Sequence, residues 1–130
     1  MKSLFSAEVK ISNWFKNKNI ENSNADNLFD ACEFLDIVKI SELLKSGESP
    51  NVTDEYGQTP LHIALDSEID SYVQSNRSFK KLKFSAAKLL IEYGASLEAK
   101  DFKEKTPIDW VARYGDEAIN EFETKVLKDY

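Results

Sequence analysis

A stretch of eight residues occurs twice in this chain, and this repeat constrains the fold more than any other feature. DEYGQTPL at 54–61 and DFKEKTPI at 101–108 share an aspartate, a Thr-Pro step and an aliphatic residue in one register. Upstream lies a second shared pattern, SELLKSG at 41–47 and KLLIEYG at 88–94. The final glycine of each copy follows a helical run, where a residue with positive φ is wanted. The chain therefore stacks copies of one supersecondary unit.

The Thr-Pro step predicts the start of a helix. Thr59 is placed to accept a backbone N–H and so cap that helix. Pro60 takes the first helical position, where its missing N–H costs nothing. His62, the only histidine in the chain, follows two residues later.

TPLHIA followed by a Leu-Leu-x-x-Gly pattern resembles the ankyrin repeat, whose period is about 33 residues. The resemblance covers roughly residues 21–127 and contains two and a half recognisable repeats. It implies an all-α solenoid of antiparallel helix pairs stacked side by side. It also implies that His62 hydrogen-bonds backbone near the turns and ties neighbouring units together, a structural role in place of a catalytic one.

We expect one domain over residues 1–130. Its parts are an N-terminal helix (1–20), a degenerate first repeat (21–53), a second repeat with an insertion (54–100) and a third repeat or C-terminal cap (101–130). The first repeat lacks the Thr-Pro step but keeps Leu28, Ala31, Asp36, Leu43, Leu44, Gly47 and Asn51. In the third, Glu104 replaces the turn glycine, Asp109 the histidine and Val111 the first alanine. Altered end units are typical of caps.

The second repeat is 14 residues too long, and the excess lies between Ala64 and Ala87. Apolar residues with helical spacing continue on both sides of Ser75. They are Leu61, Leu65, Ile69, Tyr72 and Val73, and then Phe79, Leu82, Ala86, Leu89, Leu90 and Tyr93. This spacing predicts an elongated hairpin, in which two helices each gain two turns and project about 10 Å further. A disordered loop is the alternative.

The N-terminus carries another apolar stripe. Leu4, Ala7, Ile11 and Trp14 share one helical face, which either caps the first repeat or docks onto a partner. The segment has no continuous apolar core, so we do not interpret it as a signal peptide. No apolar run approaches the 18 or so residues of a membrane span. With a single cysteine and hence no internal disulfide, these features indicate a cytoplasmic protein.

The net charge of −6 is unevenly distributed, because residues 25–56 carry eight acidic and two basic side chains. Such a segment repels nucleic acid and attracts a basic protein. A basic run also occurs, comprising Arg77, Lys80, Lys81 and Lys83. Interleaved aromatic residues invite a nucleic-acid interpretation of this run. We expect it instead to pair with the acidic residues Asp66, Glu68 and Asp70 of the preceding helix.

Patterns for catalysis and metal binding are weak. One cysteine and one histidine cannot build a structural zinc site, and the glycines form no phosphate-binding loop. The alternating acids after Leu65 lack the glycine and late glutamate of a calcium loop. Cys32 occupies a small-residue position of the repeat, so we expect an inert core thiol. Among 23 acidic residues some pair can always meet in a fold, but the sequence singles out none.

The resemblance implies protein binding through a concave face made of turn tips and the first helix of each unit. Positions that the fold leaves free on that face form the predicted partner-binding site: Glu33, Phe34, Glu55, Tyr56, Gln58, Asp66, Ser67, Phe102, Lys103, Lys105, Arg113 and Tyr114. Four of these residues are aromatic, and large rigid side chains are typical anchors of interfaces. Tyr56 and Tyr114 are the strongest candidates, because their polar ends suit a wet surface.

We therefore predict a non-enzymatic interaction module, monomeric alone, that binds one basic protein partner. No cofactor, metal, nucleic acid, membrane or small-molecule substrate is expected. A more specific hypothesis is inhibition, since a small acidic chain of this kind resembles bacterial immunity proteins that neutralise a cognate toxin. The alternative is a structural adaptor or complex subunit without inhibitory activity.

Overall fold

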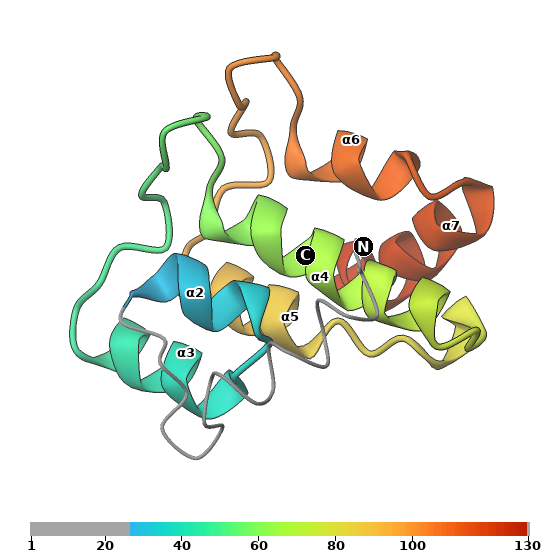
Figure 1. Ribbon diagram of the computed structural model, residues 1–130, viewed down its shortest axis with the longest axis horizontal. Helices are drawn as coiled ribbons and strands as arrows, with labels where there is room; N and C mark the ends of the chain where they lie inside the picture. The colour runs from blue at the N-terminus through green and yellow to red at the C-terminus, as the bar shows by residue number, and fades with distance from the viewer. Residues whose placement is uncertain (1–26, 130) are drawn as a thin grey trace.

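The computed structural model describes residues 27–129, which form helices joined by turns and contain no strand. Three helix pairs follow one another: α2 (Leu28–Glu33) with α3 (Ile37–Lys45), α4 (Pro60–Gln74) with α5 (Ser85–Glu92), and α6 (Pro107–Ala112) with α7 (Asp116–Lys125). The short 3-10 helices η2 (Phe79–Lys81) and η3 (Leu127–Asp129) complete the chain. The first helices, α2, α4 and α6, lie side by side in one layer (Figure 1). The predicted all-α solenoid is confirmed, whereas the predicted N-terminal helix lies outside the described residues.

The helices α4 and α6 begin in the same way. Thr59 Oγ1 accepts the backbone N–H of His62 at 3.4 Å, and Thr106 Oγ1 accepts that of Asp109 at 3.2 Å. A proline holds the first position of both helices. The predicted start of α4 is confirmed, and its repeat in α6 explains why the two Thr-Pro stretches lie in register.

The glycines that end the helical runs have the predicted left-handed backbone. Gly47 has φ of 106° and Gly94 has φ of 101°. In each case the residue after the glycine donates its backbone N–H to a carbonyl five residues earlier. Glu48 donates to Leu43 at 3.1 Å, and Ala95 donates to Leu90 at 2.9 Å. This bond satisfies a carbonyl that the helix end leaves open.

The core lies between the helix layers and contains small side chains where helices approach each other. Ala31, Ala64, Ala87 and Ala118 are completely buried. Cys32 is equally buried, and burial, reinforced by the charge of Glu68, raises the pKa of its thiol. The predicted core position of Cys32 is confirmed, and the raised pKa disfavours the thiolate, which is the effective nucleophile.

The elongated hairpin is confirmed for its first helix only. The helix α4 has 15 residues, whereas α2 and α6 have six each. In contrast, α5 has eight residues and α3 has nine, so the second helix gains nothing. The alternative of a disordered loop is also wrong, because Leu82 and Phe84 in the connection are buried.

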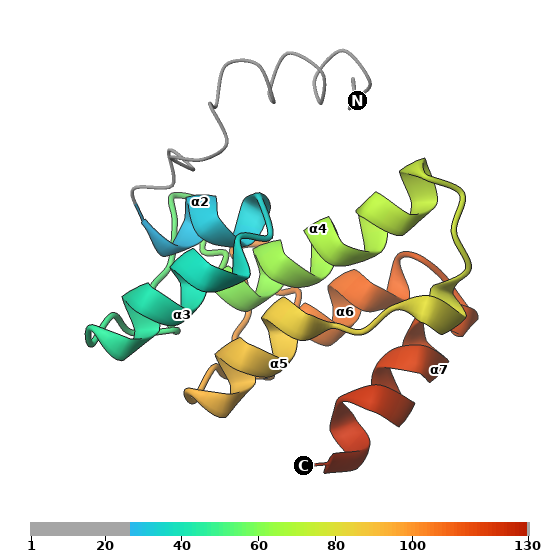
Figure 2. The ribbon, with the colours of Figure 1, turned by 90° about the horizontal axis from the view of Figure 1, so that it is seen from below.

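Contacts between distant residues explain why the connection is not helical. Phe84 has φ of 54° and places its ring against Phe122 of α7, with ring centroids 5.4 Å apart. The helix α5 then begins without a local side-chain cap. Instead, Glu68 of α4 accepts the backbone N–H of Ala86 at 2.8 Å. Figure 2 shows α7 diverging from α5, and the inserted connection packs against α7.

The predicted charge pairing within the hairpin is wrong. Each acidic residue has another partner: Asp66 accepts the Tyr114 hydroxyl at 2.7 Å, Glu68 accepts the Ala86 N–H, and Asp70 accepts the Gln74 amide at 2.8 Å. Within residues 27–128 the ion pairs are Lys100–Glu104 and Lys125–Glu121. The basic run therefore remains unpaired with the carboxylates of α4 and is discussed below.

Candidate protein-binding surface

The imidazole of His62 joins two neighbouring turns. Its Nδ1 accepts the backbone N–H of Thr59 at 3.0 Å, and its Nε2 lies 2.9 Å from the carbonyl oxygen of Lys105. A carbonyl can only accept, so Nε2 donates to the Lys105 carbonyl while Nδ1 accepts the Thr59 N–H. The second repeat is thus bonded to the turn of the third, and the expected structural role of His62 is confirmed.

We call the turn at 54–58 the second turn and the turn at 101–105 the third turn, after the repeats that they open. An aspartate shapes the third turn from inside. The Asp101 carboxylate accepts the N–H groups of Lys103 and Lys105 at 2.9 Å each and the indole N–H of Trp110 at 3.1 Å. Burial opposes ionisation of Asp101, but these hydrogen bonds prevail and lower the pKa of its carboxyl group. Trp110 also meets His62 edge to face, with ring centroids 5.3 Å apart. The turn therefore has a fixed shape on a packed base.

The tips of the second and third turns are joined to each other. Phe102 donates its backbone N–H to the carbonyl of Tyr56 at 3.0 Å. Its ring covers Gly57, where an added Cβ would lie 2.5 Å from the ring, and Gly57 has φ of 79°. Tyr56 is 60% exposed and Phe102 is 77% exposed. We call Tyr56 and Phe102 the turn-tip pair.

The first loop is tied to the stack as well. The Asn51 side-chain amide donates to the Gly94 carbonyl at 3.0 Å, and its oxygen accepts the Ser96 N–H at 2.8 Å. Asp54 accepts the N–H groups of Tyr56 and Gln58, as Asp101 does in the next turn. Both loops, between α3 and α4 and between α5 and α6, are therefore held by side-chain bonds to backbone.

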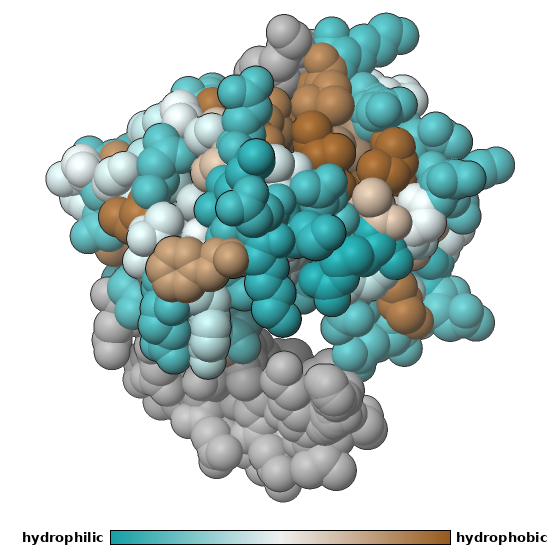
Figure 3. Space-filling view, turned by 90° about the horizontal axis from the view of Figure 1, so that it is seen from above, coloured by the Kyte–Doolittle hydropathy of each residue, from teal (hydrophilic) through white to brown (hydrophobic). Residues whose placement is uncertain are grey.

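The predicted site residues fall into two groups on the layer of first helices. Six lie at the turns: Glu55, Tyr56, Gln58, Phe102, Lys103 and Lys105. Six lie further along the first helices, at the end of α2, in the middle of α4 and directly after α6: Glu33, Phe34, Asp66, Ser67, Arg113 and Tyr114. About six residues of helix, or roughly 9 Å, separate the groups along α4. Figure 3 looks onto the end that carries the turns, where apolar side chains form separate patches in a largely hydrophilic surface.

Several of these residues also stabilise the stack. Tyr114 is half-buried and donates its hydroxyl to Asp66, so that the turn after α6 is bonded to α4. Burial, together with the Asp66 carboxylate, raises the pKa of Tyr114. Phe34 packs against the core, and the Arg113 guanidinium lies 5.1 Å from the centre of the Trp110 ring. Tyr114 therefore differs from Tyr56, whose ring projects from a turn.

The charge of the candidate surface changes along the stack. The twelve residues include three acids (Glu33, Glu55 and Asp66) and three bases (Lys103, Lys105 and Arg113). The acids belong to the first two repeats, and the bases belong to the third. Sequence reasoning assigned no role to Trp110, although its bond to Asp101 positions the third turn. A tryptophan in the helix that follows the shared aspartate is the signal that could have identified it.

Chemistry other than binding has little support in these geometries. Both ring nitrogens of His62 are occupied by backbone groups, and Cys32 is enclosed in the core. Over residues 27–129, no three His, Cys, Asp or Glu side chains are grouped so that they could hold a metal ion. Within the described part of the chain, no helix combines the length and apolar character needed to cross a membrane.

A stack of helix pairs clamped turn to turn, with free side chains at its tips, defines a repeat solenoid. The sequence profile described as ankyrin repeat matches residues 56–102, the segment that contains His62, the insertion and both residues of the turn-tip pair. The chain belongs to the ankyrin-repeat family. Repeats of this family generally mediate interactions between proteins.

Relatives carry the same repeat in longer chains. A putative ankyrin repeat protein of Rickettsia felis (strain ATCC VR-1525 / URRWXCal2) is 34% identical over 107 residues, which are 75% of this chain and 42% of the relative. A second, from Rickettsia bellii (strain RML369-C), is 40% identical over 83 residues, which are 61% of this chain and 28% of the relative. The protein fem-1 homolog CG6966 of Drosophila melanogaster is 31% identical over 78 residues, which are 60% of this chain and 10% of that protein. This chain thus spans less than half of each relative.

The clamp predicts a specific loss of stability. We expect His62→Ala to lower the free energy of unfolding by about 1–3 kcal/mol, because the Thr59 N–H and the Lys105 carbonyl lose their partner. Urea unfolding followed by circular dichroism measures this change. Asp109→Ala is the matched control, since Asp109 caps its own helix from the same repeat position and accepts the N–H of Thr106 in the same turn. An equal or smaller loss for His62→Ala would contradict the clamp.

Proposed function

We propose that this chain is a non-enzymatic module that binds one protein partner through the turn-tip pair and the neighbouring predicted site residues along α2, α4 and α6. The observation that carries the proposal is the exposure of two aromatic rings, 60% for Tyr56 and 77% for Phe102, on joined turns. Backbone bonds already fix these turns, so little conformational entropy is lost when the rings are buried. Rigid aromatic side chains at the centre of an interface supply much of its binding energy.

Charge indicates which partner surface fits and how it is oriented. The first two repeats expose Glu33, Glu42, Glu48 and Glu55, whereas the third turn exposes Lys103 and Lys105. A partner with a basic patch facing the first repeat is attracted at that end. The lysines of the third turn then repel a reversed placement of the same patch. The acidic segment thus favours a basic partner in one orientation.

The more specific form of this proposal is inhibition, in which the module is an immunity protein that covers a basic active cleft of a cognate toxin. The exposed glutamates beside a rigid aromatic pair support it, because such a surface can occupy a cleft that binds anionic substrates. A structural adaptor or complex subunit is the alternative. A saturating amount of the module abolishes the activity of an inhibited partner but leaves that of a scaffolded one unchanged.

Substitution of the turn-tip pair tests the binding surface. We expect Tyr56→Ala and Phe102→Ala each to weaken partner binding by about 1–2 kcal/mol, or roughly 5–30-fold in Kd. The partner is first captured from the source cell with the unaltered chain, and Kd is then measured by isothermal titration calorimetry. Tyr93→Ala is the matched control, because Tyr93 is an exposed tyrosine at the end of α5 in the other layer.

Charge substitutions test the orientation of the partner separately. Reversal of Glu33 and Glu55 to lysine is expected to slow association and reduce its salt dependence, with little change in dissociation rate. Unchanged binding after all four substitutions, or an acidic partner surface, would disprove this account. Thermal unfolding of Phe102→Ala is measured in parallel, because the Phe102 ring also covers Gly57.

A further inference from the structure

The connection between α4 and α5, which contains η2, carries four exposed cations. Arg77, Lys80, Lys81 and Lys83 are all exposed, and no ion pair within residues 27–128 includes any of them. Arg77 stacks over the Tyr72 ring at 4.2 Å. We call these four residues the basic patch. Its charge is not neutralised by the carboxylates of α4, which have other partners.

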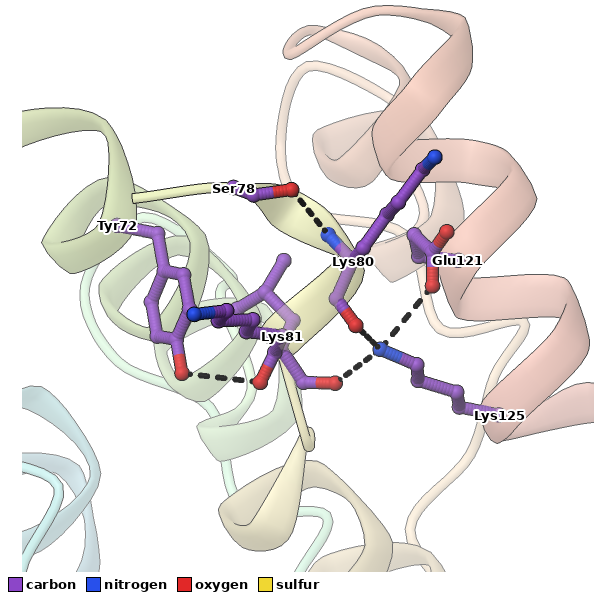
Figure 4. Close-up of polar contacts among 7 residues, drawn as sticks. Tyr72, Ser78, Lys80, Lys81, Glu121 and Lys125 are labelled. Carbon is purple, nitrogen blue, oxygen red and sulfur yellow. Dashed lines mark hydrogen bonds and ion pairs between the residues drawn. The ribbon is translucent and has the colours of Figure 1, made fainter. Parts of the chain in front are cut away.

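The backbone beneath the basic patch is held by other side chains. The Tyr72 hydroxyl donates to the Lys81 carbonyl at 3.0 Å, and the Lys125 ammonium donates to the carbonyls of Lys80, at 2.7 Å, and Leu82 (Figure 4). Lys125 also pairs with Glu121 at 3.0 Å. Three successive carbonyls are therefore occupied, and Figure 4 shows the side chain of Lys80 pointing away from these bonds. The patch is a preorganised group of cations on a fixed backbone.

We propose that the basic patch binds an acidic segment of a protein partner. Four cations within seven residues attract a cluster of carboxylates, and the fixed backbone reduces the entropy lost on binding. The patch follows the C-terminal end of α4, whereas the turn-tip pair adjoins its N-terminal end (Figure 1). The 15 residues of α4 span roughly 22 Å. This surface is therefore separate from the proposed concave site and does not depend on it.

The same observations argue against a nucleic acid at the patch. Single strands are held by bases stacked on exposed aromatic rings, together with cations that follow the backbone. Here one face of Tyr72 is covered by Arg77, Phe84 is buried, and Phe79 packs against the core. The chain as a whole carries a charge of −6, which repels an extended phosphate backbone. A short acidic peptide needs neither a stacking platform nor a long basic track.

An amide NMR titration with a glutamate-rich peptide of about ten residues tests this proposal at low salt. We expect shift changes concentrated at residues 77–83 and reversed by high salt. Replacement of Lys80, Lys81 and Lys83 by glutamine is expected to raise Kd about tenfold or more. The matched control replaces the exposed Lys45, Lys100 and Lys128 by glutamine and is expected to change Kd less than about twofold.

Four outcomes would overturn the proposal. They are absence of binding, equal weakening by both triple variants, tighter binding of a thymine oligonucleotide of matched length, and concentration-dependent shifts at 77–83 without peptide. The second outcome would indicate net charge alone, the third a nucleic-acid site and the fourth a second copy of this chain. Glutamine is one atom shorter than lysine but remains polar on an exposed position, and the bonds to the backbone carbonyls do not involve the replaced side chains, so the variants are expected to fold. Tyr56→Ala should leave peptide binding unchanged, which separates this test from that of the concave surface.

Discussion

Phe84→Ala is expected to lower the free energy of unfolding by about 3–5 kcal/mol and to loosen α7 from the stack. The Phe84 side chain is 1% exposed, and its ring meets Phe122 edge to face at 5.4 Å. Phe122 is the largest buried side chain of α7, so this contact joins the inserted connection to the last helix. Truncation removes an aromatic pair and leaves a cavity where the connection, α5 and α7 meet.

Urea unfolding measures the total loss, and amide hydrogen exchange locates it. Exchange over residues 116–126 should accelerate more than exchange over 60–66. Phe79→Ala is the matched control, because Phe79 lies in the same connection but is only half-buried. If both variants lower the free energy of unfolding equally, or if amide exchange accelerates uniformly along the chain, the connection does not stabilise α7. The insertion would then be an elaboration of α4 alone.

The parts of this fold that sequence reasoning predicted correctly depend on neighbouring residues. Thr59 caps a residue three positions away, and Gly47 ends a helix by a bond to the adjoining turn. Such contacts leave a fixed spacing in the sequence. The same applies to the clamp, since His62 bonds within its own turn and reaches Lys105 only because the repeats stack. The local pattern and the repeat period are together sufficient to predict the helix caps and the clamp.

The inserted connection could not be predicted in this way. Its apolar residues have helical spacing, but the Phe84 ring packs against Phe122 of α7. The first turn of α5 donates the Ala86 N–H to the Glu68 carboxylate of α4. Both partners are distant in sequence. The candidate site shows the same limit, because the sequence predicts Asp66 and Tyr114 as separate surface positions, whereas they are bonded to each other across 48 residues. Spacing describes each residue alone and says nothing of that pairing.

Glu68→Gln is expected to stabilise the protein at alkaline pH and to reduce the dependence of its stability on pH. The Glu68 side chain is 7% exposed, Oε2 accepts the Ala86 N–H at 2.8 Å, and Oε1 has no partner among the described residues. Burial raises the pKa of this carboxyl group from about 4.5 to about 7, although the N–H groups of Ala86 and Ala87 and the charge of Lys88 favour the ionised form. Above pH 7 the folded chain therefore encloses a carboxylate with one unsatisfied oxygen.

The sign of the effect follows from proton binding. Between about pH 4.5 and pH 7 the folded state holds a proton on Glu68 that the unfolded state has released. The contribution of Glu68 to stability is therefore highest at low pH, declines through that window and is constant above it. A shift of this size corresponds to a loss on the order of 3 kcal/mol. Glutamine keeps an oxygen that can accept the Ala86 N–H, but it never ionises.

Urea unfolding at pH 5 and pH 8 separates the charge from other consequences of the substitution. The stability of Glu68→Gln relative to the unaltered chain should rise by about 2–3 kcal/mol between these pH values, because any cost of packing the amide is the same at both. Asp70→Asn, two residues further along α4 and only half-buried, should show a much smaller change. Parallel pH profiles for Glu68→Gln and the unaltered chain would show that water or a cation reaches Oε1. In that case the start of α5 is not closed by a buried acid, and the connection before it is more open than its contacts indicate.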